Sequence, residues 1–243
     1  MLALSDVSPE IKNIKDFLFL PGFHSPTNAL LFAPMNTWAG RYKSVKDTFR
    51  LEIRTIDTSA GGTYPLITSV TGLPSDSQYL VACPSEVGGV VVVTASGIIH
   101  IDQSGRLVST SVNGWWNYTT NMKSDSSYES QKLALDNSHA QFVTENDMLL
   151  VLETGEVHQI RFEMDGRAVG AIKVDEQSST VPPPSTLVPA GSDGIFVGSV
   201  EGDSLLAMVE KARDQSAQEE PETKQQEMDV DDWDEGKLRF ADC

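Results

Sequence analysis

The sequence predicts an all-β protein: a partial β-propeller of about three to four four-stranded blades with a disordered acidic C-terminal tail. Three observations carry this prediction. Short apolar runs recur between turn residues, glycine-containing turns join them at a regular spacing, and acidic residues concentrate at the end of the chain. Strand-length runs bounded by turn signals are typical of β-sheets, and near-equal spacing of such units is typical of propeller blades.

Four predicted hairpins form the framework of the sheets. Gly40, Gly97, Gly155 and Gly202 each stand between two apolar runs and lie 57, 58 and 47 residues apart. The runs before these glycines are 29–33, 90–95, 148–152 and 195–197, and the runs after them are 49–56, 98–101, 157–162 and 205–209. A further run precedes each hairpin, at 17–20, 79–83, 140–144 and 186–190, and candidate fourth strands include 66–70 and 168–174. A strand, a glycine turn and a second strand predict a β-hairpin.

Three regions follow from this pattern: an N-terminal extension (1–13), the partial propeller (14–211) and an acidic disordered linker or tail (212–243). Two long insertions interrupt the propeller, at 35–47 and 112–130. From Glu210 to Cys243 the chain has twelve acidic and five basic residues, a composition typical of a solvated, disordered segment. Trp233 within this tail is either a stray aromatic residue or a short partner-binding anchor.

Three points stay open at the level of sequence. The outer strand of the second unit is either 106–112 or 132–135. The segment 204–213 predicts either a strand or a short helix capped by Ser204. A two-sheet sandwich is the alternative architecture, because regularly spaced short strands suit both folds.

Charge and composition exclude several classes of function. The chain has 243 residues, a formal net charge of −17 and two cysteines, which predict no disulfide framework. The sequence contains no apolar run near the roughly 18 residues of a membrane-spanning helix. A strongly acidic chain repels phosphate backbones, because affinity for nucleic acid comes mostly from lysine and arginine. We therefore expect no membrane partner and no direct binding of nucleic acid by the isolated chain.

We expect no catalytic residues, no bound cofactor, no metal site and no small-molecule substrate. His100 and His158 follow Gly97 and Gly155 at equivalent places, which indicates repeated positions in successive blades rather than a metal site. A propeller hydrolase or lyase that uses these two histidines as acid and base is the alternative. Trp115 and Trp116 form an aromatic pair in an insertion, either as a protein-binding anchor or as core packing.

An ordered set of motifs resembles one protein family. These motifs are 17–23 (FLFLPGF), 26–27 (PT), 30–34 (LLFAP), 36–41 (NTWAGR), 47–48 (DT), 88–92 (GGVVV), 148–157, 165–167 (DGR), 196–199 (FVGS) and 202–206 (GDSLL). Together they resemble the large subunit of the cleavage and polyadenylation specificity factor, over roughly residues 14–210. The chain departs from the family pattern at Phe23, Ala33 and Asp203, where the family usually has Tyr, Glu and Asn.

The resemblance implies a non-enzymatic scaffold in the nucleus, and the body would correspond to the second half of the family's first propeller. Family members organise pre-mRNA 3′-end processing by holding a zinc-finger subunit and a WD-repeat subunit that read the polyadenylation signal. RNA would then be contacted mainly through these partners. The superfamily also includes the damaged-DNA-binding large subunit and a splicing-factor propeller protein, so an adaptor of the ubiquitin-ligase or splicing branch is the alternative. Trp38, Gly40 and Arg41 are expected to shape an inter-strand loop.

Overall fold

The computed structural model describes residues 7–57, 64–191 and 194–208, which form a partial β-propeller. Its strands pair antiparallel in chain order within four separate sheets. The first sheet is β1 (Ile14–Leu20), β2 (Thr27–Phe32), β3 (Phe49–Thr55) and β4 (Leu66–Leu73), and the second is β5 (Ser77–Ala82), β6 (Val90–Thr94), β7 (Gly97–Ile101) and β8 (Leu107–Ser111). The third is β9 (His139–Phe142), β10 (Asp147–Val151), β11 (Glu156–Asp165) and β12 (Ala168–Thr180), and the fourth has β13 (Pro184–Ala190), β14 (Gly194–Ser199) and β15 (Leu205–Met208).

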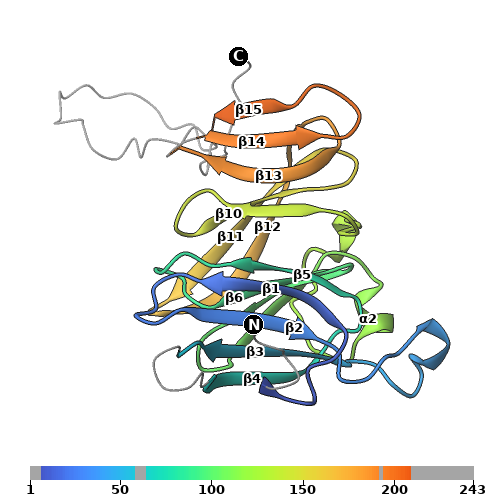
Figure 1. The fold of residues 1–243 in the computed structure, drawn as a ribbon. Coiled ribbons are helices and arrows are strands. Elements are labelled where there is room, and N and C mark those ends of the chain that lie inside the picture. The colour runs from blue at the N-terminus through green and yellow to red at the C-terminus, as the bar shows by residue number, and fades with distance from the viewer. Residues whose placement is uncertain (1–6, 58–63, 192–193, 209–243) are drawn as a thin grey trace, which may run out of the picture.

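The sheets follow one another as blades, from β1–β4 at the bottom of Figure 1 to β13–β15 at the top. The first strands of neighbouring sheets lie beside one another, β1 against β5 and β9 against β13. This is the radial repetition of four-stranded sheets that defines a propeller. Four separate sheets also exclude the two-sheet sandwich.

Each inner blade is apolar on both faces, because successive apolar side chains of its central strands point to opposite faces of the sheet. On β6, Val90 and Val92 pack toward the first sheet, while Val91 and Val93 pack toward the third. On β10, Leu149 and Val151 face the fourth sheet. Successive side chains of a strand point to opposite faces, so a continuous valine run fits a strand buried on both sides. The cores between blades therefore hold the sheets together.

The glycine turns close the hairpins where a side chain would not fit. Gly155 has a φ of +87°, and a Cβ there would lie 1.9 Å from the backbone oxygen of Val181. Glycine adopts this left-handed conformation without a steric penalty. Gly40 differs, because it lies in the short helix η1 (Ala39–Arg41) within the long connection between β2 and β3.

The structure settles both segments that the sequence left open as far as its described residues extend; residues 209–213 of the second segment lie outside them. The outer strand of the second sheet is β8, and 132–135 lies in the connection that follows it. Leu205 pairs with Val197 in the ladder between β14 and β15, so the helix alternative is wrong for Leu205–Met208. The tail 212–243, with Trp233, lies outside the described residues.

The described part of the N-terminal extension packs on the outer face of the first sheet. Ile11 forms a small cluster with Leu30 and Phe32, and the Asn13 side-chain amide donates a hydrogen bond to the Ala33 carbonyl oxygen (2.9 Å). Among the described residues, the structure has no helix long and apolar enough to cross a membrane.

Candidate interaction surface

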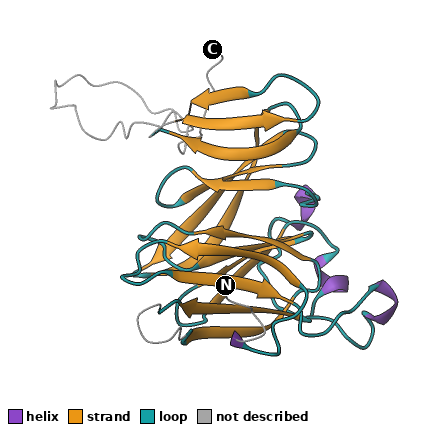
Figure 2. Ribbon diagram, in the orientation of Figure 1, coloured by secondary structure: helices purple, strands orange, loops and turns teal. Residues whose placement is uncertain are grey.

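The two predicted insertions emerge on the same side of the blades. In each sheet the strands alternate in direction, so connections that follow even-numbered strands all lie at one edge. The connection 33–48 follows β2 and the connection 112–138 follows β8. Figure 2 shows their short helices, η1, α2 (Trp116–Thr119) and η2 (Glu129–Gln131), on that side. The alternating direction of the strands thus brings together two segments that lie about 80 residues apart in sequence.

Asp47 ties the two insertions together. Its carboxylate accepts hydrogen bonds from the Thr120 hydroxyl, the Asn121 backbone N–H (3.1 Å) and the Asn121 side-chain amide (3.0 Å). The Lys46 ammonium donates to the backbone carbonyl oxygen of Asn117 (3.4 Å). Hydrogen bonds to a charged acceptor are stronger than neutral ones, so Asp47 forms the main hydrogen-bonded link between the two insertions.

A cleft of about 530 Å³ opens between the two linked insertions. Tyr42, Trp115 and Tyr118 supply its aromatic walls. Lys43 and Lys46 are the only charged residues among those that line it. The cleft is therefore aromatic and positively charged, although the chain as a whole carries −17.

The predicted aromatic pair is divided between this surface and the core. Trp115 is 69% exposed, and its ring lies 5.7 Å from that of Tyr118, which is 67% exposed. Trp116 is 1% exposed and donates its indole N–H to the Met122 carbonyl oxygen (2.9 Å). Exposure therefore leaves Trp115 as the candidate anchor of the pair, and Trp116 serves core packing.

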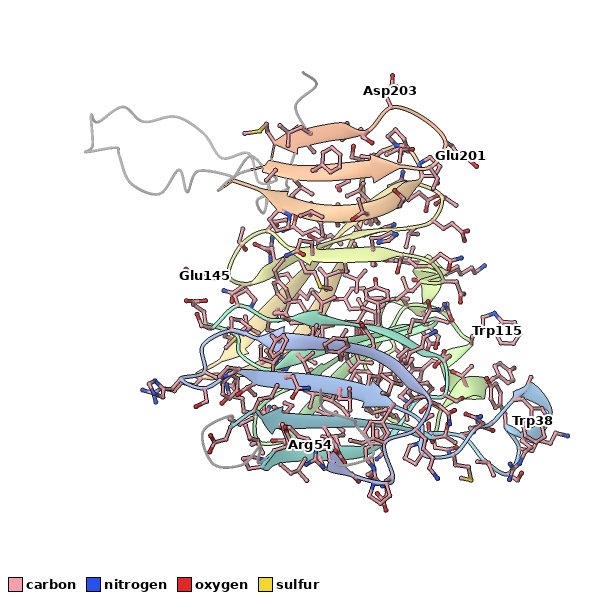
Figure 3. All side chains as sticks on the ribbon, in the orientation of Figure 1. Trp38, Arg54, Trp115, Glu145, Glu201 and Asp203 are labelled. Atoms are coloured by element: carbon pink, nitrogen blue, oxygen red, sulfur yellow. The ribbon has the colours of Figure 1, made fainter. Side chains whose placement is uncertain are left out.

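A second aromatic–basic contact lies in the loop 33–48. The Arg41 guanidinium stacks over the Trp38 ring at 5.1 Å, and a Cβ at Gly40 would lie 3.3 Å from the Trp38 indole nitrogen. These three residues shape the inter-strand loop, as the sequence predicts. Figure 3 shows Trp38 and Trp115 on the same side of the molecule. Exposed tryptophan, tyrosine and arginine are the residue types enriched at the energetic centres of protein interfaces.

The histidines occupy equivalent third strands, β7 and β11, and both are buried. His100 Nε2 lies 2.9 Å from the Gly88 carbonyl oxygen, and His158 Nδ1 lies 3.2 Å from the Asp175 carbonyl oxygen. Burial lowers the pKa of His100, which keeps its imidazole neutral. Carbonyl partners hold these rings in place but activate no nucleophile, so the geometry gives the hydrolase alternative no support.

Other chemistry-bearing side chains also have structural surroundings. Cys83 is buried, and burial raises the pKa of its thiol, so the thiolate nucleophile is not formed at neutral pH. Burial also raises the pKa of Asp76, whose carboxylate accepts a hydrogen bond from Ser96 (2.8 Å). Within the described ranges, no cluster of three or more His, Cys, Asp or Glu side chains is placed to hold a metal ion.

Sequence reasoning singled out Trp38, Arg41 and Trp115 but missed Tyr42, Lys43, Lys46 and Tyr118. The available signal was the interleaving of aromatic and basic residues in 35–47 and the group of aromatic residues in 112–130. That signal gains meaning only when strand parity places the insertions side by side.

Fold and surface together define a class: a partial β-propeller with exposed aromatic side chains on two long connections between strands. The family model described as "RSE1/DDB1/CPSF1 first beta-propeller" matches residues 17–230, and the chain belongs to this family. It is 31% identical over 208 residues to Protein CFT1 of Yarrowia lipolytica, covering 83% of this chain and 16% of that protein. It is 32% identical over 199 residues to cleavage and polyadenylation specificity factor subunit 1 of Arabidopsis thaliana, covering 81% of this chain and 13% of that protein. The chain therefore spans about one seventh of the length of these curated relatives.

Proposed function

We propose that the chain acts as a non-enzymatic scaffold subunit in nuclear pre-mRNA 3′-end cleavage and polyadenylation. The observation that carries this proposal is its similarity to proteins named CFT1 and cleavage and polyadenylation specificity factor subunit 1. The buried, carbonyl-bonded histidines and the protonated buried thiol support a role without catalysis. The second-half position within the family's first propeller, and the role of 212–243 as a linker or tail, belong to the same proposal.

The proposed partners are protein subunits with zinc fingers and WD repeats that read the polyadenylation signal. The surface formed by Tyr42, Trp115 and Tyr118 supports this, because exposed aromatic side chains supply large, rigid contact areas. The net charge of −17 supports contact with RNA mainly through those partners. An adaptor of the ubiquitin-ligase or splicing branch is the second candidate, because the family model covers those propellers as well.

Affinity capture tests the proposal. The tagged full chain is expressed in cells of its own source, and co-purifying proteins are identified by mass spectrometry. We expect subunits of the 3′-end processing machinery to be enriched at least tenfold over a tag-only control, and imaging of the tagged chain to show it in the nucleus. Recovery of ubiquitin-ligase or splicing subunits in their place, or of none of these, would overturn the proposal.

A matched pair of variants tests whether the cleft contributes. Trp115→Ala with Tyr118→Ala removes the two exposed rings without touching the core. Val200→Asp changes a residue that is 70% exposed in the connection between β14 and β15. We expect the first variant to lose most of the captured subunits and the second to retain them.

A further inference from the structure

The aromatic cleft between the insertions has a charge opposite to that of one segment of the same chain. We propose that residues 227–235 bind in this cleft, with Trp233 as the anchor and Lys43 and Lys46 facing the acidic side chains. The inference rests on the geometry and charge of the cleft, and it holds whether or not the chain works in 3′-end processing.

Charge complementarity is the first argument. The segment 227–235 holds six acidic residues and no basic one, while the charged residues that line the cleft are two lysines. The Lys46 ammonium donates one of its three N–H groups to the Asn117 carbonyl oxygen, which leaves two for a ligand, and the Lys43 side chain is exposed. Single exposed ion pairs contribute little, so several carboxylates and a second type of contact are needed for a defined complex.

The aromatic anchor supplies that second type of contact. Trp233 is the only aromatic residue between Ala212 and Lys237. Trp115 and Tyr118 present exposed rings in the cleft, and an indole can pack against such rings in an offset or edge-to-face arrangement. A lysine ammonium over the Trp233 ring adds a cation–π contact. The aromatic anchor thus matches the aromatic walls of the cleft, and the acidic residues beside the anchor match the two lysines of the same cleft.

The extended length of the connecting chain is comparable to the path that it must cover. Residues 209–226 lie between β15 and the segment, and fully extended they span about 60 Å. β15 ends at the edge opposite to the insertions, so the chain must first cross a blade, about 20 Å for six residues. A compact body of about 200 residues has a radius of gyration of roughly 17 Å and hence a diameter of about 44 Å, so the remaining 40 Å reaches the cleft along a nearly extended path. Docking within one molecule does not depend on protein concentration.

Single-stranded RNA is the competing occupant, because aromatic and basic side chains also stack bases and neutralise phosphates. The net charge of −17 opposes it, since the whole chain repels a phosphate backbone that the two lysines attract. A tethered acidic segment meets the same repulsion but is held close to its site by the chain. The charges therefore favour the segment over RNA.

Zero-length carbodiimide cross-linking of the full chain tests the proposal, because this reagent joins a lysine amine only to a carboxylate in contact with it. We expect links from Lys43 and Lys46 to residues 227–235 to exceed those from the exposed control residues Lys15 and Lys132 at least fivefold. The excess should persist on tenfold dilution. Trp233→Ser should reduce it to the control level, as should Trp115→Ala with Tyr118→Ala, and Val200→Asp should leave it unchanged.

Four results would overturn the proposal. The first is equal yields at all four lysines, and the second is an excess that does not depend on Trp233. The third is links that mix ¹⁴N- and ¹⁵N-labelled chains and vanish on dilution, which would identify a second copy as the donor of the segment. A twelve-nucleotide RNA that binds the Trp233→Ser chain and the unaltered chain equally, through Trp115, would likewise assign the cleft to RNA. Partner subunits and the segment would compete for the same cleft, but the cross-link yields are measured on the isolated chain and affinity capture on its partners, so each proposal can fail while the other stands.

Discussion

Trp115 and Trp116 show how two identical neighbours acquire opposite roles. Successive residues of a helix point about 100° apart, so in the turn at α2 one ring faces solvent while the next enters the core beside Gly97. A Cβ at Gly97 would lie 2.6 Å from the Trp116 ring, which shows how closely the strand and the indole pack. The environment of each residue, rather than its type, therefore decides which tryptophan is available for binding.

At the same scale, His100 predicts how stability depends on pH. The unfolded chain protonates this imidazole at its ordinary pKa of about 6.5, whereas burial lowers the pKa in the folded state. The unfolded state therefore binds more protons below pH 6.5. His100 contributes stability that is fully present above that pH and is lost as the pH falls toward its folded pKa, by at most about 1.4 kcal/mol per pH unit.

Urea unfolding at pH 7.5 and 5.5 measures this contribution. We expect His100→Gln to lose less unfolding free energy between these pH values than the unaltered chain. His24→Gln, at an exposed turn, should keep the full loss. If all three proteins show the same loss, His100 does not titrate as its burial requires.

At the scale of elements, the strands followed from short apolar runs between glycine-containing turns, and the insertions from the longer stretches between such runs. The run 90–95 predicts a strand because it is short and rich in valine, which favours strands. The four-residue β15 was ambiguous because it is too short to show whether its apolar residues repeat with the period of a strand or of a helix. Its pairing with β14 shows that it is a strand. The cleft was not predictable as a unit, because Lys43 and Tyr118 meet only through tertiary structure.

Substitution of Asp47 should weaken the contact between the two insertions. Asp47→Ala removes the acceptor of three hydrogen bonds and leaves the buried Thr120 hydroxyl without it. We expect the unfolding free energy to fall by about 1–3 kcal/mol. Hydrogen exchange should rise in 116–122 and 35–47 while β6 and β10 stay protected.

Asp203→Ala is the matched control, because Asp203 is exposed in the connection between β14 and β15 (Figure 3). It should change neither the exchange of the insertions nor stability. Unchanged exchange of 116–122 in Asp47→Ala would show that packing alone holds the loops.

At the scale of the whole molecule, the outer faces of the first and fourth sheets differ. The fourth sheet presents Val188, Phe196, Leu206 and Met208, each 39–49% exposed. The first sheet presents Phe17 and Phe19 beside Glu52, which pairs with Arg54 at 2.8 Å. The inner blades bury equivalent apolar faces against each other, whereas Ile11 covers only Leu30 and Phe32 on the first sheet, so the exposed parts of both outer faces are open to association.

We therefore expect the isolated 243-residue chain to associate or to be unstable. In sedimentation velocity its mean mass should rise with concentration, and Phe196→Asp with Leu206→Asp should lower that rise. Val200→Asp should not, because Val200 lies off the sheet face. A strictly monomeric species that unfolds cooperatively would contradict this expectation.

The alternating direction of the strands also gives the blades two sides with different practical uses. Turns such as 102–106, which follow odd-numbered strands, lie at the edge away from the insertions. An epitope tag or a fluorescent label placed there would leave the aromatic cleft open to its occupant. The same label in 112–138 would obstruct the cleft. The direction of the preceding strand thus tells an experimenter which loops can carry a label and which loops form the aromatic cleft.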